Sequence, residues 1–176
     1  MAMTLITTNT ESGDANSAFT SGIDSTYKLY IFKFIDLNPA TDAAYFTFNG
    51  SIDGGSNYNV TKTATFFRAY NAEDNSGTAV GYRLADDSGQ QTGYQRLHQQ
   101  IGNAADESAA GTLWLFNPSN TAYAKHFYSK VNGTDGTQSR TGWVSGYFNT
   151  TDNIDAVDFK MSSGNMDGII KMYGVG

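Results

Sequence analysis

The stretch that decides the fold is residues 154–175, which read IDAVDFKMSSGNMDGIIKMYGV. In its first half, Val157, Phe159 and Met161 alternate with polar residues, which is the two-residue period of a β-strand with one buried face. Residues 162–165 are turn-forming, and a more apolar alternating run follows from 169 to 175. The two runs predict a β-hairpin. Because its second strand is so apolar, we expect that strand to lie inside a sheet rather than at its edge.

The rest of the chain repeats this pattern of short apolar runs and turns. Residues 27–36, YKLYIFKFID, have two apolar faces and predict a central strand. Residues 111–116 and 123–131, separated by Asn-Pro-Ser-Asn, predict a second hairpin. Further strands are expected around residues 45–48, 60–70 and 143–148. Turn signals recur roughly every 8 to 12 residues. The sequence therefore predicts an all-β fold, an antiparallel, jelly-roll-like β-sandwich of about eight to ten strands with at most one short helix.

Residues 71–110 carry the weakest signal. Tyr94, Leu97, His98 and Ile101 recur at the three- and four-residue spacing of a short amphipathic helix. The alternative is a pair of short strands, around residues 82–84 and 94–97. The pattern leaves both open.

The length of 176 residues fits one domain. We expect residues 27–176 to form a single β-sandwich domain. Residues 1–26 are mostly Thr, Ser, Asn, Gly and Asp, and such a segment does not fold alone. It is interpreted either as edge strands of the same domain or as an extended arm that docks on a neighbouring subunit.

Charge and composition exclude several classes of protein. The formal net charge of −6 argues against binding the phosphate backbone of nucleic acid. There are no cysteines, so disulfides and Cys-based metal sites are excluded. The first residues lack a signal-peptide pattern, and no apolar run is long enough to span a bilayer. A soluble protein made in the cytoplasm, without nucleic-acid or membrane partners, is predicted.

No constellation of catalytic residues stands out. His98 and His126 are far apart and lack metal-site spacing, so we expect each to be a satisfied or surface histidine. Acids such as Asp86 and Asp87 sit beside loop residues and are interpreted as solvated rather than as a glycosidase pair. The loop from Asp53 to Asn57 offers oxygen ligands for calcium, but a plain turn is the favoured reading. The sequence predicts no enzyme, no cofactor and no metal site.

The remaining functional signal is aromatic. Trp143 with Tyr147, and Trp114 with Tyr123 and Tyr128, could form a sugar-stacking platform or a subunit contact. The alternative is that most of these rings fill the core. Candidate residues of a contact or glycan-binding surface are Asp53, Asn57, Trp143 and Tyr147.

Several stretches resemble a known group of proteins. They are SGIDSTYKLYIFKFIDLNPATD from Ser21, SIDGG from Ser51, IGN from Ile101, GTLWLFNPS from Gly111, and MDGI to YG near the end of the chain. In these stretches the chain resembles small β-sandwich virion proteins of tailed bacteriophages, common in marine phages. The resemblance covers most of the chain from Ser21 onward. Its motifs are strand and turn signatures rather than chemical ones.

The resemblance implies a non-enzymatic virion structural protein. The first place it implies is a capsid decoration, or cement, protein on the outside of the shell, with the major capsid protein as partner and a homo-oligomer, such as a trimer, as an expected state. The alternative is a tail-fibre or receptor-binding head domain that recognises host surface glycans. There the loops and surfaces bearing Asp53, Trp143 and Tyr147 would meet the glycan.

Overall fold

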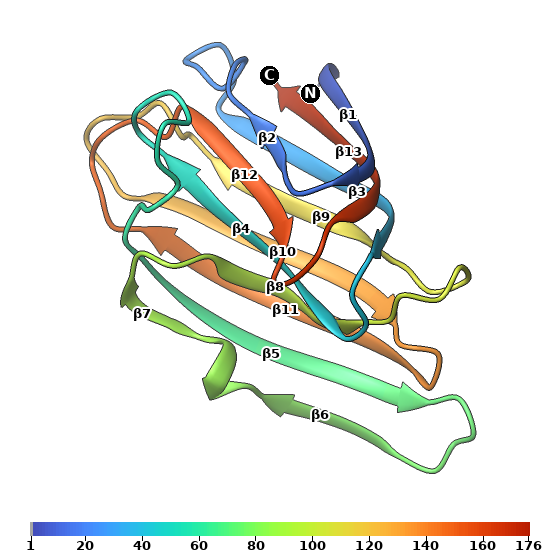
Figure 1. Cartoon of the computed structure of the whole chain (residues 1–176). Coiled ribbons are helices and arrows are strands. Elements are labelled where there is room, and N and C mark those ends of the chain that lie inside the picture. Colours follow the sequence, from blue (N-terminus) through green and yellow to red (C-terminus); the bar gives the residue numbers. More distant parts are fainter. Residues whose placement is uncertain (1) are drawn as a thin grey trace.

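The computed structural model describes residues 2–176 and shows two antiparallel β-sheets packed face to face (Figure 1). The large sheet has nine strands in the order β1-β13-β3-β9-β10-β11-β5-β6, with β7 also paired to β5, and the small sheet has the order β2-β12-β4-β8. The predicted β-sandwich is confirmed. The strands are β1 (Met3–Asp14), β2 (Ser17–Phe19), β3 (Leu29–Pro39), β4 (Ala44–Ser51), β5 (Lys62–Ala72), β6 (Thr78–Tyr82), β7 (Ser88–Gln91), β8 (Gln95–Ile101), β9 (Ala109–Phe116), β10 (Lys125–Thr134), β11 (Gln138–Phe148), β12 (Ala156–Met161) and β13 (Met166–Val175).

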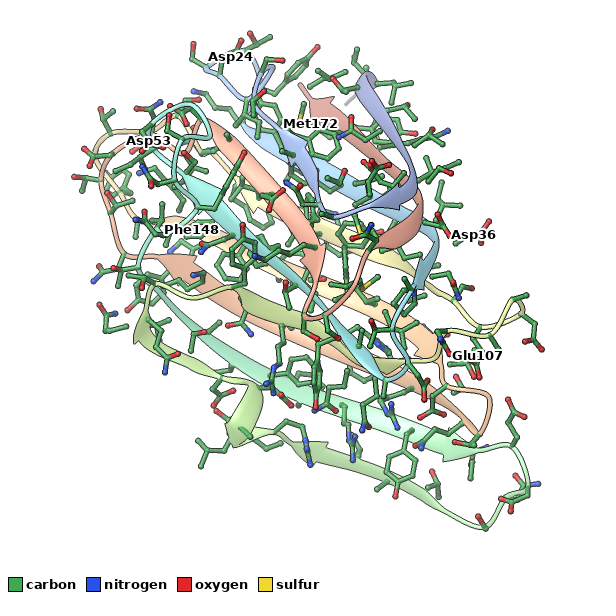
Figure 2. All side chains as sticks on the ribbon, in the orientation of Figure 1. Asp24, Asp36, Asp53, Glu107, Phe148 and Met172 are labelled. Atoms are coloured by element: carbon green, nitrogen blue, oxygen red, sulfur yellow. The ribbon has the colours of Figure 1, made fainter. Side chains whose placement is uncertain are left out.

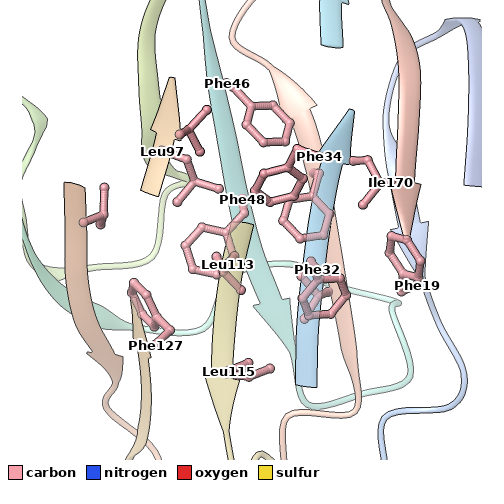
Figure 3. Close-up of a cluster of buried hydrophobic side chains, with 14 of the residues drawn as sticks. Phe19, Phe32, Phe34, Phe46, Phe48, Leu97, Leu113, Leu115, Phe127 and Ile170 are labelled. Carbon is pink, nitrogen blue, oxygen red and sulfur yellow. The ribbon is translucent and has the colours of Figure 1, made fainter. Parts of the chain in front are cut away.

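The core lies between the two sheets and is rich in phenylalanine (Figure 3). Phe159 of β12 is central, because its ring packs against five others with centroids 5.2 to 6.2 Å apart. Most of these contacts are edge-on or tilted, which suits the quadrupoles of aromatic rings. Every second residue of the central strands points into this layer and is almost completely buried. The rings that surround Phe159 are Phe19, Phe32, Phe34, Phe46 and Phe48.

The predicted terminal hairpin is wrong in its pairing. β12 pairs with β2 and β4 in the small sheet, whereas β13 pairs with β1 and β3 in the large sheet. Residues 162–165 therefore carry the chain from one layer to the other, with Gly164 at a φ of +72°. The buried residues of the two strands face one another across the core instead of lying side by side. The expectation that β13 lies inside a sheet is confirmed, because it has a strand on each side.

Residues Gln95–Ile101 form strand β8, so of the two alternatives for this segment the helix is wrong. Its pairing with β4 has two irregularities, and Gln100 has a φ of +47°. These irregularities break strict alternation, so the buried residues recur at spacings that imitate a helix. The only helical element in residues 2–176 is the 3₁₀ turn η1 (Leu84–Asp86), and no helix there is long and apolar enough to cross a membrane. The count of thirteen strands exceeds the predicted eight to ten because short edge strands such as β2 and β7 carry little signal.

The two sheets differ in extent. The N-terminal segment supplies β1 at one edge of the large sheet and β2 at one edge of the small sheet. At the other edge, β5 and β6 extend beyond the small sheet, as the lower part of Figure 1 shows. We call β5, β6 and the segment that joins them the β5–β6 wing. The small sheet thus covers one face of the large sheet only in part, and within residues 2–176 no layer covers the opposite face.

Candidate functional site: the outer face of the large sheet

The face of the nine-stranded sheet that points away from the small sheet is here called the outer face. Strand alternation places the residues between the core positions on it. Trp114 of β9 and Tyr128 of β10 lie directly opposite in register and stack with centroids 4.6 Å apart. Tyr128 is 43% exposed, so this aromatic pair reaches solvent. Other aromatic rings on the same face are Phe67 of β5, Phe116 of β9, His126 of β10, Trp143 and Tyr147 of β11, and Tyr173 of β13.

The two aromatic candidates of β11, Trp143 and Tyr147, both lie on this outer face. Trp143 stacks on Phe67 with the two ring planes inclined by 8° and centroids 5.1 Å apart. Tyr147 lies beside His126, 5.9 Å between centroids. Of the aromatic groups chosen from the sequence, Trp114 and Tyr128 also lie here, and Tyr123 is 73% exposed in the segment before β10. None of these rings belongs to the core.

A shallow groove of about 430 Å³ opens between the aromatic pairs. Its floor is formed by the small side chains of Thr63, Thr65 and Ser145, and larger rings form its walls. The Thr63 hydroxyl already accepts from the Gln90 amide and the Thr65 hydroxyl donates to the Ser145 carbonyl oxygen, so the surface that the groove offers is mainly apolar. The wall residues are Phe116, His126, Tyr128 and Tyr147.

The outer face also carries an uncompensated positive charge. Lys33 of β3 and Lys171 of β13 are directly opposite in register, although like charges at such positions repel. Lys130 of β10 lies in the same row, with its ammonium 5.7 Å from the ring centre of Trp143. Strands β5, β9, β10 and β11 contain no Asp or Glu. Strands β3 and β13 contain one acid each, Asp36 and Asp167, and none of the three lysines forms an ion pair within residues 2–176. The surface around the lysine row is therefore complementary to an anionic surface.

Asp53 and Asn57 lie apart from this face, in the loop after β4 at one end of the sandwich (Figure 2). The Asp53 carboxylate accepts hydrogen bonds from the Asn57 backbone N–H (2.9 Å), the Asn57 side-chain amide (2.7 Å) and the Ser51 hydroxyl (2.7 Å). The Asn57 amide, followed by Ser51, lowers the pKa of Asp53. Its oxygens are therefore occupied within a turn. In residues 2–176 no hydrogen bond or aromatic contact joins this loop to Trp143 or Tyr147.

Two lysines are buried at the opposite, inner face of the large sheet. Lys62 and Lys125 lie on either side of Phe148 in register, and each is at most 1% exposed. The Lys62 ammonium donates to the carbonyl oxygens of Val60 (3.1 Å) and Gly93 (2.5 Å), and burial lowers its pKa to about 8. Sequence alternation could have placed Lys62 inside, since Val60, Ala64 and Phe66 share its face. Lys62 is nevertheless not among the site residues that the sequence predicted.

Only His126 has the surroundings that the sequence predicted, because the Nδ1 of the buried His98 has no hydrogen-bond partner in residues 2–176. His98 is buried, its Nε2 lies 2.9 Å from the Arg140 carbonyl oxygen, and burial lowers its pKa to about 4. His126 is exposed. No group of three or more His, Asp or Glu side chains within residues 2–176 is arranged to hold a metal ion.

The interpretation of Asp86 as a solvated loop acid is wrong. Asp86 is 3% exposed and pairs with Arg96, because η1 folds back against the edge strand β8. Asp158 of β12, which the sequence analysis did not single out, is also buried at 2% exposure. It accepts hydrogen bonds from the Asn16 amide (2.6 Å) and the Tyr94 hydroxyl (2.7 Å). Strand alternation predicts which face of β12 carries Asp158. It does not predict that Asp158 is buried, because the residues that cover it, Asn16 and Tyr94, are distant in the sequence.

No protein-family model matches this chain, and no curated protein matches its sequence. Among solved structures, one similar chain is a protein of unknown function from Bacteroides ovatus, determined in structural genomics. It is 8% identical, with a TM-score of 0.28, and the match covers 58% of this chain and 45% of that chain. The match thus spans less than half the length of that protein.

Proposed function

We propose that this protein is a non-enzymatic structural protein of a bacteriophage virion, a decoration protein that binds the major capsid shell from outside. The place in the virion rests on the resemblance of the quoted strand and turn motifs. The mode of binding rests on the structure: the outer face of the large sheet docks on the shell. A homo-oligomer on the shell, such as a trimer, belongs to the same proposal.

The single observation that carries the docking mode is the open aromatic face with its lysines. Aromatic rings bury large areas at low entropic cost and are enriched in the energetic centres of interfaces. Here Phe67, Trp143, Trp114 and Tyr128 form two stacked pairs on one uncovered face. Lys33, Lys130 and Lys171 lie in one row beside them and add a requirement for carboxylates on the shell surface. Many copies, each with a modest contact, would stabilise the shell by multivalency.

Purified particles provide the test of this proposal. Quantitative mass spectrometry should find hundreds of copies of the protein per virion. Shells that lack the protein should bind the wild type, and Trp143→Ala together with Tyr128→Ala should weaken binding at least tenfold while the fold is retained. Lys28→Gln, which removes one exposed charge, serves as the control. A copy number near a dozen would refute the role as a decoration protein, and full binding by the double variant would refute the docking mode.

A second function, glycan recognition by a receptor-binding head, is favoured by the groove between Tyr147 and Tyr128. Its volume of about 430 Å³ and its aromatic lining suit a small saccharide stacked on a ring. A glycan array distinguishes the two functions. Retention of a defined oligosaccharide that Tyr147→Ala abolishes, together with absence of the protein from shells, would favour recognition over decoration.

A further inference from the structure

All four arginines of the chain meet on the opposite side of the molecule from the outer face, where the small sheet ends at β8. They come from four different elements and are connected through Asp86 and Gln99. The Gln99 amide donates a hydrogen bond to the Asp86 carboxylate, so Asp86, Gln99 and the four arginines form one connected network. The four are Arg68 of β5, Arg83 before η1, Arg96 of β8 and Arg140 of β11.

Two of these arginines have a carboxylate of their own. Arg96 Nη1 lies 2.5 Å from Asp86 Oδ1, and its guanidinium also covers the ring of Tyr45, 4.2 Å from the centroid. Arg140 Nη2 lies 3.0 Å from Asp135 Oδ2. Charge-assisted pairs of this length leave little further demand for an anion. The Arg140 Nε is also buried without a hydrogen-bond partner in residues 2–176, but the Arg140 side chain is only 4% exposed and out of reach of a ligand. Arg96 and Arg140 are therefore assigned a structural role.

Arg68 and Arg83 are not compensated in this way. Arg68 Nη1 donates to the neutral Gln99 side chain at 2.9 Å, and in residues 2–176 no carboxylate lies within 4.0 Å of its guanidinium. Arg83 Nε is 3.6 Å from Asp86 Oδ2, an oxygen that already accepts from Gln99. This Nε is buried and has no hydrogen-bond partner in the described chain. Both guanidiniums thus have unused donors.

The register of the β5–β6 wing brings these two side chains together. Arg68 lies opposite Gly81, and Arg83 follows two residues later on the same side, a diagonal neighbour within reach of a long side chain. The backbone N–H of Arg83 donates to the Phe66 carbonyl at 2.9 Å, which fixes it beside the strand. Desolvation, and then the charges of Arg83 and Arg140, lower the pKa of Arg68. An anion would relieve that repulsion.

The same site is open to a ligand. Gly81 has no side chain, and the space where a Cβ would stand has no atom within 4 Å. The small sheet does not cover the inner surface of the wing, and the Arg83 side chain is 39% exposed. The ring of Tyr70, 5.2 Å from the Arg68 guanidinium carbon, holds that side chain against the sheet. The site is therefore both preorganised and accessible.

We propose that Arg68 and Arg83 form a binding site for an oxyanion group, a carboxylate, sulfate or phosphate, on the inner surface of the β5–β6 wing. Guanidinium groups match the planar or forked geometry of such anions and can bind them through paired N–H donors. The site is independent of the proposed docking on the shell, since it lies on the other side of the large sheet.

The experiment measures thermal unfolding in chloride buffer and after addition of acetate, sulfate or inorganic phosphate at constant ionic strength. An anion at roughly ten times its Kd should raise the Tm by about 3 to 5 °C. Arg68→Gln and Arg83→Gln should abolish this shift, and Lys28→Gln should keep it. Because Arg68 is repelled by its neighbours, Arg68→Gln should not lower the Tm in chloride. The anion with the largest shift identifies the preferred geometry, planar or tetrahedral.

Wild-type protein supplies a second measurement that does not depend on variants folding. In ¹H–¹⁵N NMR spectra, the Arg68 and Arg83 Nε–H signals should move with saturable dependence on the anion, while the Arg140 signal stays in place. Equal Tm shifts in wild type and both arginine variants would show a general salt effect and overturn the site. The absence of any shift with all three anions would overturn it as well.

Discussion

Both faces of the large sheet are rich in aromatic side chains, but one face is buried and the other is exposed to solvent. The inner face presents Tyr30, Phe32 and Phe34 of β3, each at most 2% exposed, to the small sheet. The outer face presents Trp114, Tyr128 and other rings to solvent. The difference is that one face has a second layer and the other has none. Aromatic content alone therefore does not indicate burial, and large uncovered aromatic patches are typical of surfaces that bind another molecule.

The largest difference between the two faces should appear when one phenylalanine on each face is replaced by alanine. Phe32→Ala on the inner face removes a ring that packs against Phe19 and Phe159, and we expect a loss of about 3 to 5 kcal/mol in the free energy of unfolding. Phe67→Ala on the outer face removes a ring that is 44% exposed, and we expect a loss of about 1 kcal/mol. Urea unfolding of both variants measures the difference. Equal losses would mean that the outer face is covered in the isolated protein.

Lys62 at the inner face should give the next largest effect, as a dependence of stability on pH. Its pKa is about 8 in the folded state because of burial, and 10.5 is the ordinary value. Between these values the unfolded chain binds more protons, so stability must rise with pH. We expect a gain of about 1 to 2 kcal/mol from pH 8 to 9.5, measured by urea unfolding.

Lys62→Met isolates this contribution from other groups that titrate. The gain should disappear in that variant, whereas Lys130→Met on the outer face should retain it, because the Lys130 side chain is exposed. A wild-type stability that stays flat or falls over this range would contradict a protonated, buried ammonium below pH 8.

A single charge reversal on the outer face should give the smallest effect and separate stability from docking. Lys33→Glu turns the repulsive pair with Lys171 into an attractive one, and we expect a gain of about 0.5 kcal/mol in unfolding free energy. The same change should weaken binding to shells. Lys28→Glu, at an exposed position before β3, is the matched control for both measurements. Stronger shell binding by Lys33→Glu would contradict an anionic partner surface.

The sequence predicts the sandwich and many strand positions because alternation is a local signal. In β10, and in β3 as far as Phe34, the buried residues are those that alternation places on one face. Alternation does not predict which strands pair when the pairing depends on segments that are distant in the sequence. The turn before Met166 has the residues of a hairpin turn, yet it connects two layers, since local turn chemistry is the same for both. In β8 the bulges hide the two-residue period altogether.

The candidate site was only partly predictable for the same reason. Trp143 and Tyr147 were chosen because aromatic rings often form contacts, and both lie on the outer face. Asp53 and Asn57 were chosen beside them but belong to a separate loop, because sequence does not give distance between segments. The arginine cluster was missed because consecutive members are 13 to 44 residues apart in the sequence, and the first and last, Arg68 and Arg140, are 72 apart. Only the register of β5 with β6 and the fold of η1 bring them together.

Oxidative footprinting of the outer aromatic rings tests most directly whether this face is the docking surface. In the free protein, Trp114, Tyr128 and Trp143 should be labelled by hydroxyl radicals, and Phe32 and Phe34 should not. On purified particles, the labelling of the three outer rings should fall at least fivefold while that of Ile52, 41% exposed in the loop after β4, is retained. Equal labelling of the outer rings in both states, with protection confined to the loop at Asp53, would contradict the account.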